Sequence, residues 1–271
     1  MNRIFKLLVL CCLCGILGSC DVAVKRMEAK VTESKQQLAP KTRDGLELPA
    51  PLTSRPEQIL VRKGYTASYN KEWRVPNWVA WHLTAAHLKG NVKRSESAFH
   101  EDEEVPTPRA INTDYVRSGY DRGHMCPAGD NKWNAQAMDE SFLFTNICPQ
   151  APQLNRGDWN EMEQACRKWA KQCGDIYIVC GPIFYKKRAK TIGKSKVAVP
   201  DAFFKVVLTM KGKPKAIGFI YKNGDGNRPK GDYANSVDEV ERITGIDFFA
   251  SLPDKVEKQV EAQCNPDDWN I

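Results

Sequence analysis

Acid–base chemistry is most readily placed in one short polar stretch, Asp121-Arg122-Gly123-His124-Met125. An imidazole such as His124 has an ordinary pKa of about 6.5, which suits a group that takes a proton from water near neutral pH. Arg122 carries a planar cation that matches the oxygens of a phosphate. Gly123 would let the backbone turn sharply beside them. An isolated histidine more often packs or caps a turn, but these neighbours favour a reactive site.

A second polar cluster follows and contains Asn146 and Asn155. Glu163 lies eight residues after Asn155. Eight residues advance an α-helix by about 12 Å and about two turns, so the two side chains would face similar directions if the helix begins early enough. Glu163 and Arg167 are four residues apart, which by itself is more typical of a surface ion pair than of catalysis.

Together, the two clusters resemble the signatures of the DNA/RNA non-specific endonucleases, a family that includes endonuclease G and secreted bacterial sugar-non-specific nucleases. Residues 121–125, followed by Gly129, resemble the family's DRGH signature, and residues 145–150 and 154–159 match its second signature in type, order and spacing. Residues 199–207 also resemble a later strand of the family, and the resemblance spans about residues 57–252. It implies an α+β fold of the ββα-metal (His-Me finger) type, with a central antiparallel-rich sheet flanked by helices.

The resemblance implies a role for each matching residue. His124 would be the general base that activates water, and Asn155 would be the single direct protein ligand of one divalent cation. This cation is usually Mg²⁺, with Mn²⁺ or another divalent cation as alternatives. Glu163 would hold waters bound to the metal, and Asn146 would support the site. Three arginines would contact the phosphate or its developing charge, the last with a weaker alignment: Arg122, Arg167 and Arg94.

The implied chemistry agrees with the properties of Mg²⁺. This ion prefers octahedral oxygen coordination and keeps several waters, so one neutral amide oxygen suffices to position it. Most of its charge then remains available to stabilise the phosphate and the departing 3′ oxygen, while His124 deprotonates a water on the opposite side. The expected reaction is hydrolysis of DNA and RNA to 5′ phosphates. Low sequence specificity is expected, because contacts to phosphates and sugars carry little base information.

Two alternatives to this nuclease remain open. One is a catalytically inactive nucleic-acid-binding surface protein, and the other is an exported phosphodiesterase for small substrates. The presence of both His124 and Asn155 favours catalysis, because binding alone needs neither residue.

The first twenty residues have the pattern of an export signal, with Arg3 and Lys6 before an apolar run. Residues 17–20 resemble a bacterial lipobox, which predicts cleavage before Cys20 and acylation of its thiol. The alternative is a plain cleaved signal peptide. Residues 21–55 are polar and predict a flexible tether, followed by a nuclease domain over 56–271. The chain would therefore be exported and anchored by lipid to a bacterial membrane, facing the periplasm or the cell exterior.

The cysteines after Cys20 predict up to three disulfides, because an exported chain meets an oxidising compartment. No C-x-x-C motif occurs among them, which argues against a zinc ribbon and a thioredoxin-like site. Sequence alone leaves fifteen pairings open. We favour Cys126 with Cys148, since each lies two residues from a residue assigned to the site. The six cysteines are Cys126, Cys148, Cys166, Cys173, Cys180 and Cys264.

The composition is that of a folded protein with a weak preference for anionic partners. Lys and Arg number 40 against 33 Asp and Glu, which gives a net charge of +7, and 42% of the residues are hydrophobic. After residue 20 no apolar stretch approaches the length of about 20 residues that a membrane-spanning helix needs.

Hydrophobic runs predict the elements that must position the site. Short apolar runs predict strands. Residues 211–214, which include Gly212 and Pro214, predict a hairpin turn between the last two of these strands. Apolar residues at helical spacing predict a helix over 159–171. A capping box at Ser236–Glu239 predicts a second helix, and Pro253 predicts the start of a third that ends near Gln263. The predicted strands are 59–61, 78–83, 175–180, 202–210 and 216–221.

Overall fold

The computed structural model describes residues 45–94, 99–186, 188–224 and 226–271. The chain divides into two units, Met1–Gly45 and Leu46–Ile271, and the second carries the fold described here. Within the described residues, no helix is both long and apolar enough to span a bilayer. The predicted signal peptide, the lipobox with Cys20 and most of the predicted tether lie outside these residues.

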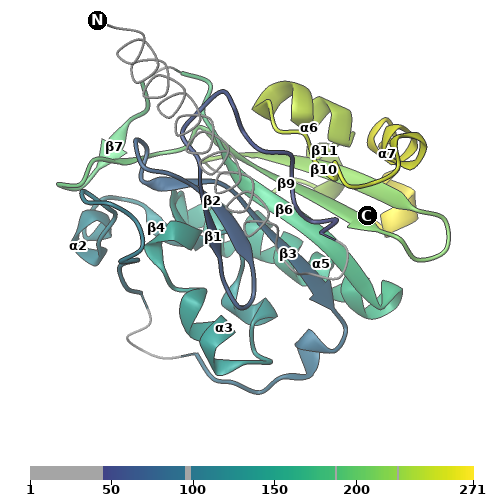
Figure 1. Cartoon of the computed structure of the whole chain (residues 1–271), viewed down its shortest axis with the longest axis horizontal. Coiled ribbons are helices and arrows are strands. Elements are labelled where there is room, and N and C mark those ends of the chain that lie inside the picture. Colours follow the sequence, from purple (N-terminus) through teal and green to yellow (C-terminus); the bar gives the residue numbers. More distant parts are fainter. Residues whose placement is uncertain (1–44, 95–98, 187, 225) are drawn as a thin grey trace, which may run out of the picture. The chain divides into compact units, whose positions relative to one another are not determined.

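The centre of the unit is a seven-stranded sheet in the order β1-β2-β3-β6-β9-β10-β11, in which all neighbouring strands are antiparallel (Figure 1). Each of the five predicted strands is confirmed, as is the hairpin between β9 and β10. The strands are β1 Gln58–Val61, β2 Thr66–Asn70, β3 Val75–Thr84, β6 Asp175–Ile183, β9 Ala202–Thr209, β10 Lys215–Lys222 and β11 Ala234–Asn235.

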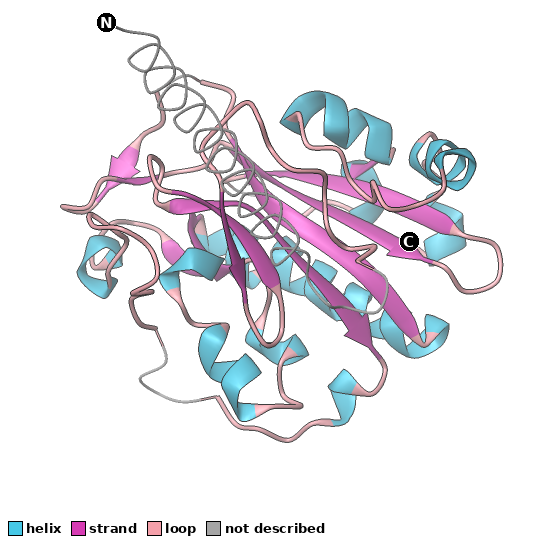
Figure 2. Cartoon of the chain, in the orientation of Figure 1, coloured by secondary structure: helices cyan, strands magenta, loops and turns pink. Residues whose placement is uncertain are grey.

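Shorter elements lie between and around these strands (Figure 2). Two further strand pairs are β4 Asp121–His124 with β5 Ile147–Gln150, and β7 Thr191–Ile192 with β8 Val197–Ala198. The α-helices are α2 Asn112–Tyr115, α3 Ala135–Glu140, α4 Pro152–Arg156, α5 Asp158–Cys173, α6 Val237–Thr244 and α7 Asp254–Glu261. Short 3₁₀ helices are η1 His87–Lys89, η2 Ala128–Asp130, η3 Phe144–Asn146, η4 Lys230–Tyr233 and η5 Pro266–Trp269.

The sheet is covered on both faces. Successive side chains of β9 point to opposite faces and pack against different helices. Phe203 and Val207 belong to a core cluster that includes residues of α5, whereas Phe204 and Leu208 belong to a second cluster with residues of α6 and α7. Figure 1 shows α5 and the α6–α7 pair on different sides of the strands. This mixed α+β architecture confirms the predicted fold class.

The predicted helix ends are formed largely as expected. The Ser236 hydroxyl accepts a hydrogen bond from the Glu239 N–H at 3.2 Å and so caps α6. The capping box is only half formed, because the Glu239 carboxylate pairs with Arg242 instead of returning to the Ser236 backbone. Pro253 is the N-cap of α7, as predicted.

The structure differs from the sequence at the predicted boundary between tether and domain. Leu46, Leu48 and Leu52 pack against the core cluster on the α6–α7 side, and the Ala50 N–H donates to the Asp247 carbonyl at 2.9 Å. The compact unit therefore begins at Leu46 rather than after Arg55. The polar composition of residues 21–55 concealed these few leucines, because their burial depends on distant partners.

The predicted disulfides are not formed, since all six cysteines of this unit are free. Cys148 lies opposite Gly123 in the β4–β5 pair, whereas Cys126 follows beyond the end of β4. The Cys126 sulfur instead accepts a hydrogen bond from Asn131 Nδ2 at 3.3 Å. The two cysteines each lie two residues from a site residue in the sequence, but this did not bring them together as a disulfide. As buried thiols they fill the core like small apolar side chains.

Candidate active site

The two sequence clusters are joined by a two-stranded ladder, in which β4 pairs antiparallel with β5 and His124 lies opposite Ile147. Gly123 lies inside this strand, so the expected sharp turn is wrong. A Cβ atom at Gly123 would lie 2.3 Å from Gln150 Oε1. The glycine is therefore required for close packing of the two strands and not for a turn.

The His124 side chain is half-buried between aromatic rings. Its ring centroid lies 5.0 Å from that of Phe142 and 5.4 Å from that of Phe99. Nε2 is buried and has no hydrogen-bond partner. Nδ1 differs from it, because among the described residues it is not an atom that is both buried and without a partner. Burial, and then the charge of Arg94, lowers the pKa of His124 to about 3. The imidazole is therefore neutral at pH 7, with one enclosed nitrogen.

Two guanidinium groups flank the same rings. The Arg94 carbon Cζ lies 4.8 Å from the Phe142 centroid, and that of Arg122 lies 5.4 Å from the Phe99 centroid. Neither arginine forms an ion pair with a carboxylate among the described residues. The structure therefore brings both arginines to His124 and leaves their charge available to an anion.

Asn155 is held by the first residue of β4. Its Nδ2 donates to Asp121 Oδ2 at 3.0 Å, and Arg156 donates to both Asp121 oxygens at 2.8 Å. Burial alone would raise the pKa of Asp121, but these hydrogen bonds outweigh it and lower the pKa. An ionised carboxylate can only accept, so it fixes the amide group with its nitrogen toward Asp121.

The orientation of Asn155 fits a metal ligand. No described residue donates a hydrogen bond to its Oδ1, so this carbonyl oxygen is free to bind a cation. The side chain of Glu163 is 14% exposed and offers two carboxylate oxygens. Its ion pair with Arg167 is long, because Oε2 lies 3.9 Å from Arg167 Nη1. Carbonyl and carboxylate oxygens are the donors that Mg²⁺, Ca²⁺ and Mn²⁺ prefer. The donor set is therefore suited to such a cation.

The spacing argument required Asn155 and Glu163 to lie on one continuous helix, but they do not. Asn155 belongs to α4, and Gly157 separates it from α5, where Glu163 lies. The α5 helix is fixed against β4 by Trp159, whose Nε1 donates to the His124 carbonyl at 3.1 Å. Tertiary contacts rather than helical periodicity thus set the relative positions of the two side chains.

Glu163 and Arg167 do not form an ordinary surface ion pair. Arg167 Nη1 donates to Asp130 Oδ1 at 2.9 Å, and the Asp130 side chain is only 1% exposed. A Cβ atom at Gly129 would lie 2.9 Å from Arg167 Nη1, so this glycine makes room for the guanidinium. Burial raises the pKa of Glu163 to about 7, an effect that Lys205 and Arg167 oppose and Asp130 reinforces.

Lys205 is a residue of this region that the sequence did not single out. It lies in the middle of β9 with no solvent exposure, and its Nζ has no hydrogen-bond partner. The Nζ atom lies 4.3 Å from the Trp159 ring and 5.3 Å from the Trp81 ring. Burial works against its charge, but nearby thiols and the carboxylates of Glu163 and Asp130 raise its pKa. A lysine within an apolar strand was the available signal.

Asn146 supports the site from within. It is fully buried, its Oδ1 accepts from the Cys126 N–H at 2.9 Å, and its Nδ2 donates to the Cys126 and Ser141 carbonyls. These contacts use its amide for holding the chain just after His124. Asn146 is therefore a positioning residue, in keeping with the supporting role expected of it.

Sequence reasoning also missed Asp121, Asp130 and the two phenylalanines beside His124. Both aspartates stand within or beside the DRGH stretch, so their positions were a usable signal. Phe99 and Phe142 had no such signal, because they come from outside both motifs. A cavity of about 600 Å³ adjoins this region and is lined in part by Phe99, Glu101 and Glu103. Arg109, which pairs with Glu101, also lines it, but none of the site residues predicted from the sequence does.

Comparisons with known proteins identify the same family as the motifs. The family model described as DNA/RNA non-specific endonuclease matches residues 47–255. The chain is 37% identical to "Nuclease EXOG, mitochondrial" of Danio rerio over 227 residues, which cover 76% of this chain but only 64% of that protein. It is 36% identical to "Nuclease C1" of Cunninghamella echinulata var. echinulata, over 79% of this chain and 90% of that protein.

The fold agrees with the sequence comparison. A chain in the crystal structure of the EndoG/EndoGI complex superposes with a TM-score of 0.72 at 32% identity, over 80% of this chain and 95% of that one. With the family model matching most of its length, this chain belongs to the DNA/RNA non-specific endonuclease family.

Proposed function

We propose that the protein is a metal-dependent endonuclease that hydrolyses DNA and RNA with low sequence specificity and leaves 5′ phosphates. The observation that carries this proposal is the combination of a neutral imidazole with an oriented amide oxygen at β4. His124 lies near the unpaired charges of Arg94 and Arg122, while the Asn155 amide is held by Asp121. Family membership supports the same reaction class.

His124 would act as the general base. Because its pKa is lowered to about 3, the ring is neutral at pH 7 and has a lone pair available. In the tautomer with the proton on the enclosed Nε2, that lone pair lies on Nδ1, which can accept a proton from water. A bound phosphodiester would bring negative charge close to Arg94, offset part of its effect and raise the proton affinity of the base.

The arginines would bind and orient the phosphate. Arg94 and Arg122 reach the His124 surroundings from different segments, and a planar guanidinium can form two parallel hydrogen bonds to phosphate oxygens. Arg167 is held in place by the buried carboxylate of Asp130, so its side chain loses little further freedom when it meets an anion. Phosphate contacts of this kind position the substrate without reading its bases.

Asn155 would hold the divalent cation through Oδ1, and Glu163 would support it from α5. When bound, such a cation supplies positive charge that stabilises the pentavalent phosphate and the leaving 3′ oxygen. Asp121 would keep the amide oxygen turned toward the cation. Mg²⁺ is the first choice, with Mn²⁺ or another divalent cation as alternatives.

A digestion assay tests the proposal directly. Supercoiled plasmid and RNA are incubated with wild type and His124→Ala across a series of divalent cations and in EDTA. We expect nicking that EDTA abolishes and that His124→Ala lowers by at least about 10²-fold, the lower range for loss of a general base, while nucleic-acid binding survives. Binding without cleavage by the wild type, or cleavage confined to a small model diester, would overturn it.

We further propose that the chain is exported and lipid-anchored through Cys20, with the nuclease domain facing the periplasm or the cell exterior. The pattern of residues 1–20 supports this placement. Acyl labelling in cells tests it. The wild type should incorporate a fatty-acid probe and Cys20→Ala should not, whereas equal labelling of both would refute the anchor.

A further inference from the structure

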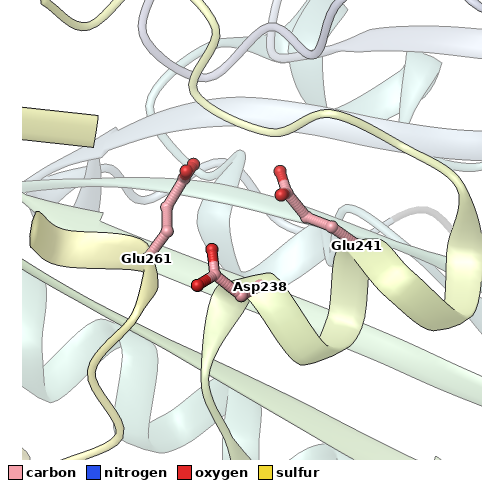
Figure 3. Close-up of side chains that lie close together, drawn as sticks. All are labelled: Asp238, Glu241 and Glu261. Carbon is pink, nitrogen blue, oxygen red and sulfur yellow. The ribbon is translucent and has the colours of Figure 1, made fainter. Parts of the chain in front are cut away.

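Three carboxylates meet between α6 and the end of α7, outside the site at His124. Asp238 and Glu241 come from α6 and Glu261 from α7, and one oxygen from each lies within 4.8 Å of the other two. Figure 3 shows the three side chains converging between the two helices. Carboxylates at such spacing repel one another unless a cation or a proton lies between them.

Glu261 provides a second and independent indication of a ligand. The residue is only 5% exposed, and its Oε1 is buried without a hydrogen-bond partner. A buried carboxylate oxygen without a partner is costly, because it has lost its water and gained nothing in exchange. Figure 3 shows this side chain directed toward the other two carboxylates.

No basic side chain of the described residues forms an ion pair with these carboxylates. None of the ion pairs among the described residues involves Asp238, Glu241 or Glu261. The Phe248 N–H donates to Glu241 Oε1 at 2.7 Å, which orients that carboxylate without neutralising the group. The basic residue Arg242 of α6 is paired with Glu239 instead.

We propose that Asp238, Glu241 and Glu261 bind one Ca²⁺ ion, which joins α6 to the end of α7. Oxygen ligands of one Ca²⁺ lie at about 2.4 Å from it and hence up to about 4.8 Å apart. The three carboxylate oxygens lie within 4.8 Å of one another, so they are close enough to share one such ion. Ca²⁺ accepts carboxylates in flexible geometry, whereas Mg²⁺ demands a near-ideal octahedron and usually keeps several waters, so a site of three carboxylates suits Ca²⁺. Asp238 is exposed, so water can complete the coordination.

This site is distinct from the proposed catalytic cation. Val237, Val240 and Val260, which flank the carboxylates on α6 and α7, belong to the core cluster on one face of the sheet. Trp159, Met162 and Cys166 of α5 belong to the cluster on the other face. A Ca²⁺ ion here would stabilise the fold rather than touch the substrate.

Thermal unfolding of the full-length chain, measured in EDTA and in about 10 mM free Ca²⁺, tests the proposal. This concentration exceeds the Kd of about 0.1–1 mM that is typical of weak extracellular calcium sites. We expect Ca²⁺ to raise the Tm by about 3–8 °C. Asn155→Ala should retain this shift, because the shift would come from Ca²⁺ at the three carboxylates and not from a cation at the catalytic site. Glu261→Gln should abolish the shift. In EDTA it should be at least as stable as the wild type, because it removes repulsion without changing shape.

Two further variants protect the test. Asp238→Asn alters an exposed residue and should fold normally while reducing the Ca²⁺ shift, so failure of Glu261→Gln to fold would not leave the question open. Glu239→Gln, on the same helix but paired with Arg242, should keep the full shift. The proposal is overturned if Ca²⁺ does not raise the wild-type Tm, if Asp238→Asn and Glu261→Gln keep the full shift, or if only Asn155→Ala loses it. The first result would mean that the carboxylates share protons instead.

Discussion

The proton affinity of His124 is set by side chains that lie far from it in the sequence. Phe142 and Phe99 enclose the ring, and Arg94 adds a positive charge nearby. The motif predicted a histidine at the site, and the structure places His124 beside Phe99 and Phe142. The lowered pKa could not be predicted, because it depends on three residues outside the motif that the fold brings together.

This environment predicts how stability depends on pH. The folded pKa of His124 is about 3, whereas an unfolded histidine has a pKa of about 6.5. Between these values the unfolded chain binds the extra proton, so the free energy of unfolding should fall as the pH falls. His124→Asn lacks this group. Urea unfolding at pH 7 and pH 5 should therefore show the wild type losing about 1–2 kcal/mol more than the variant.

The matched comparison removes the contributions of all other titrating groups, since these are common to both proteins. Glu163, for example, should act in the opposite direction, because its folded pKa of about 7 lies above the ordinary value of 4.5. An equal loss of stability in wild type and His124→Asn would show that the ring is not enclosed in solution.

Asp121 provides a second prediction at this scale. Asp121→Asn replaces an obligate acceptor by an amide that can also donate, so the Asn155 amide is no longer held with its oxygen free. The Mg²⁺ concentration for half-maximal nicking should rise by about 10- to 100-fold, as is typical when a partner of a metal ligand is lost. Titration of nicking activity against Mg²⁺ measures this change.

Arg156→Ala is the control for this variant. Arg156 also bonds to Asp121, but its side chain is 72% exposed, so its loss should leave the carboxylate in place. We expect its Mg²⁺ requirement to stay within about threefold of the wild type, since exposed ion pairs contribute little. A larger change in Arg156→Ala than in Asp121→Asn would contradict the proposed role of Asp121.

At the scale of elements, the sequence predicted the long strands and helices but not the short ones that carry the site. Strands β3, β6, β9 and β10 have continuous apolar runs, and α5 has an apolar stripe. Strands β4 and β5 have only four residues each, too few to show a hydrophobic period, and gain their conformation from each other. The break at Gly157 depends in the same way on packing rather than on local pattern.

The β4–β5 ladder makes a prediction about Gly123. In Gly123→Ala the new methyl group would lie 2.3 Å from Gln150 Oε1, so one strand must shift. We expect a loss of about 1–3 kcal/mol in the free energy of unfolding, the range for overpacking a core. Nicking activity should fall as well, because His124 is the next residue. Chemical denaturation and the plasmid assay measure the two effects.

Two further variants test the cause. Gly224→Ala should be nearly neutral, because no atom lies within 4 Å of its added methyl group. The double variant Gly123→Ala with Gln150→Ala should recover part of the lost stability, since it removes the contacted side chain. If the double variant loses the sum of the two single effects, the clash does not explain the glycine.

At the scale of the whole molecule, the sheet divides the residues that could do chemistry into two groups. The face covered by α5 carries Lys205 and the residues around His124, and the other face carries the pair α6 and α7. The sequence predicted a sheet flanked by helices but not which helix lies on which face. That assignment depends on which residues of β9 point to each side, and β9 has large apolar residues on both.

The cysteines provide the last prediction, which concerns the entire unit. All six thiols are free, and burial raises the pKa values of Cys126, Cys148 and Cys180 well above normal, which makes them poor nucleophiles. A thiol-specific reagent applied to the unfolded, non-reduced protein should therefore label all six, as mass spectrometry of the peptides can show. Dithiothreitol should leave the Tm unchanged, whereas loss of a native disulfide would typically cost about 2–5 kcal/mol. An unlabelled Cys126–Cys148 peptide pair that appears only after reduction would restore the disulfide predicted from the sequence.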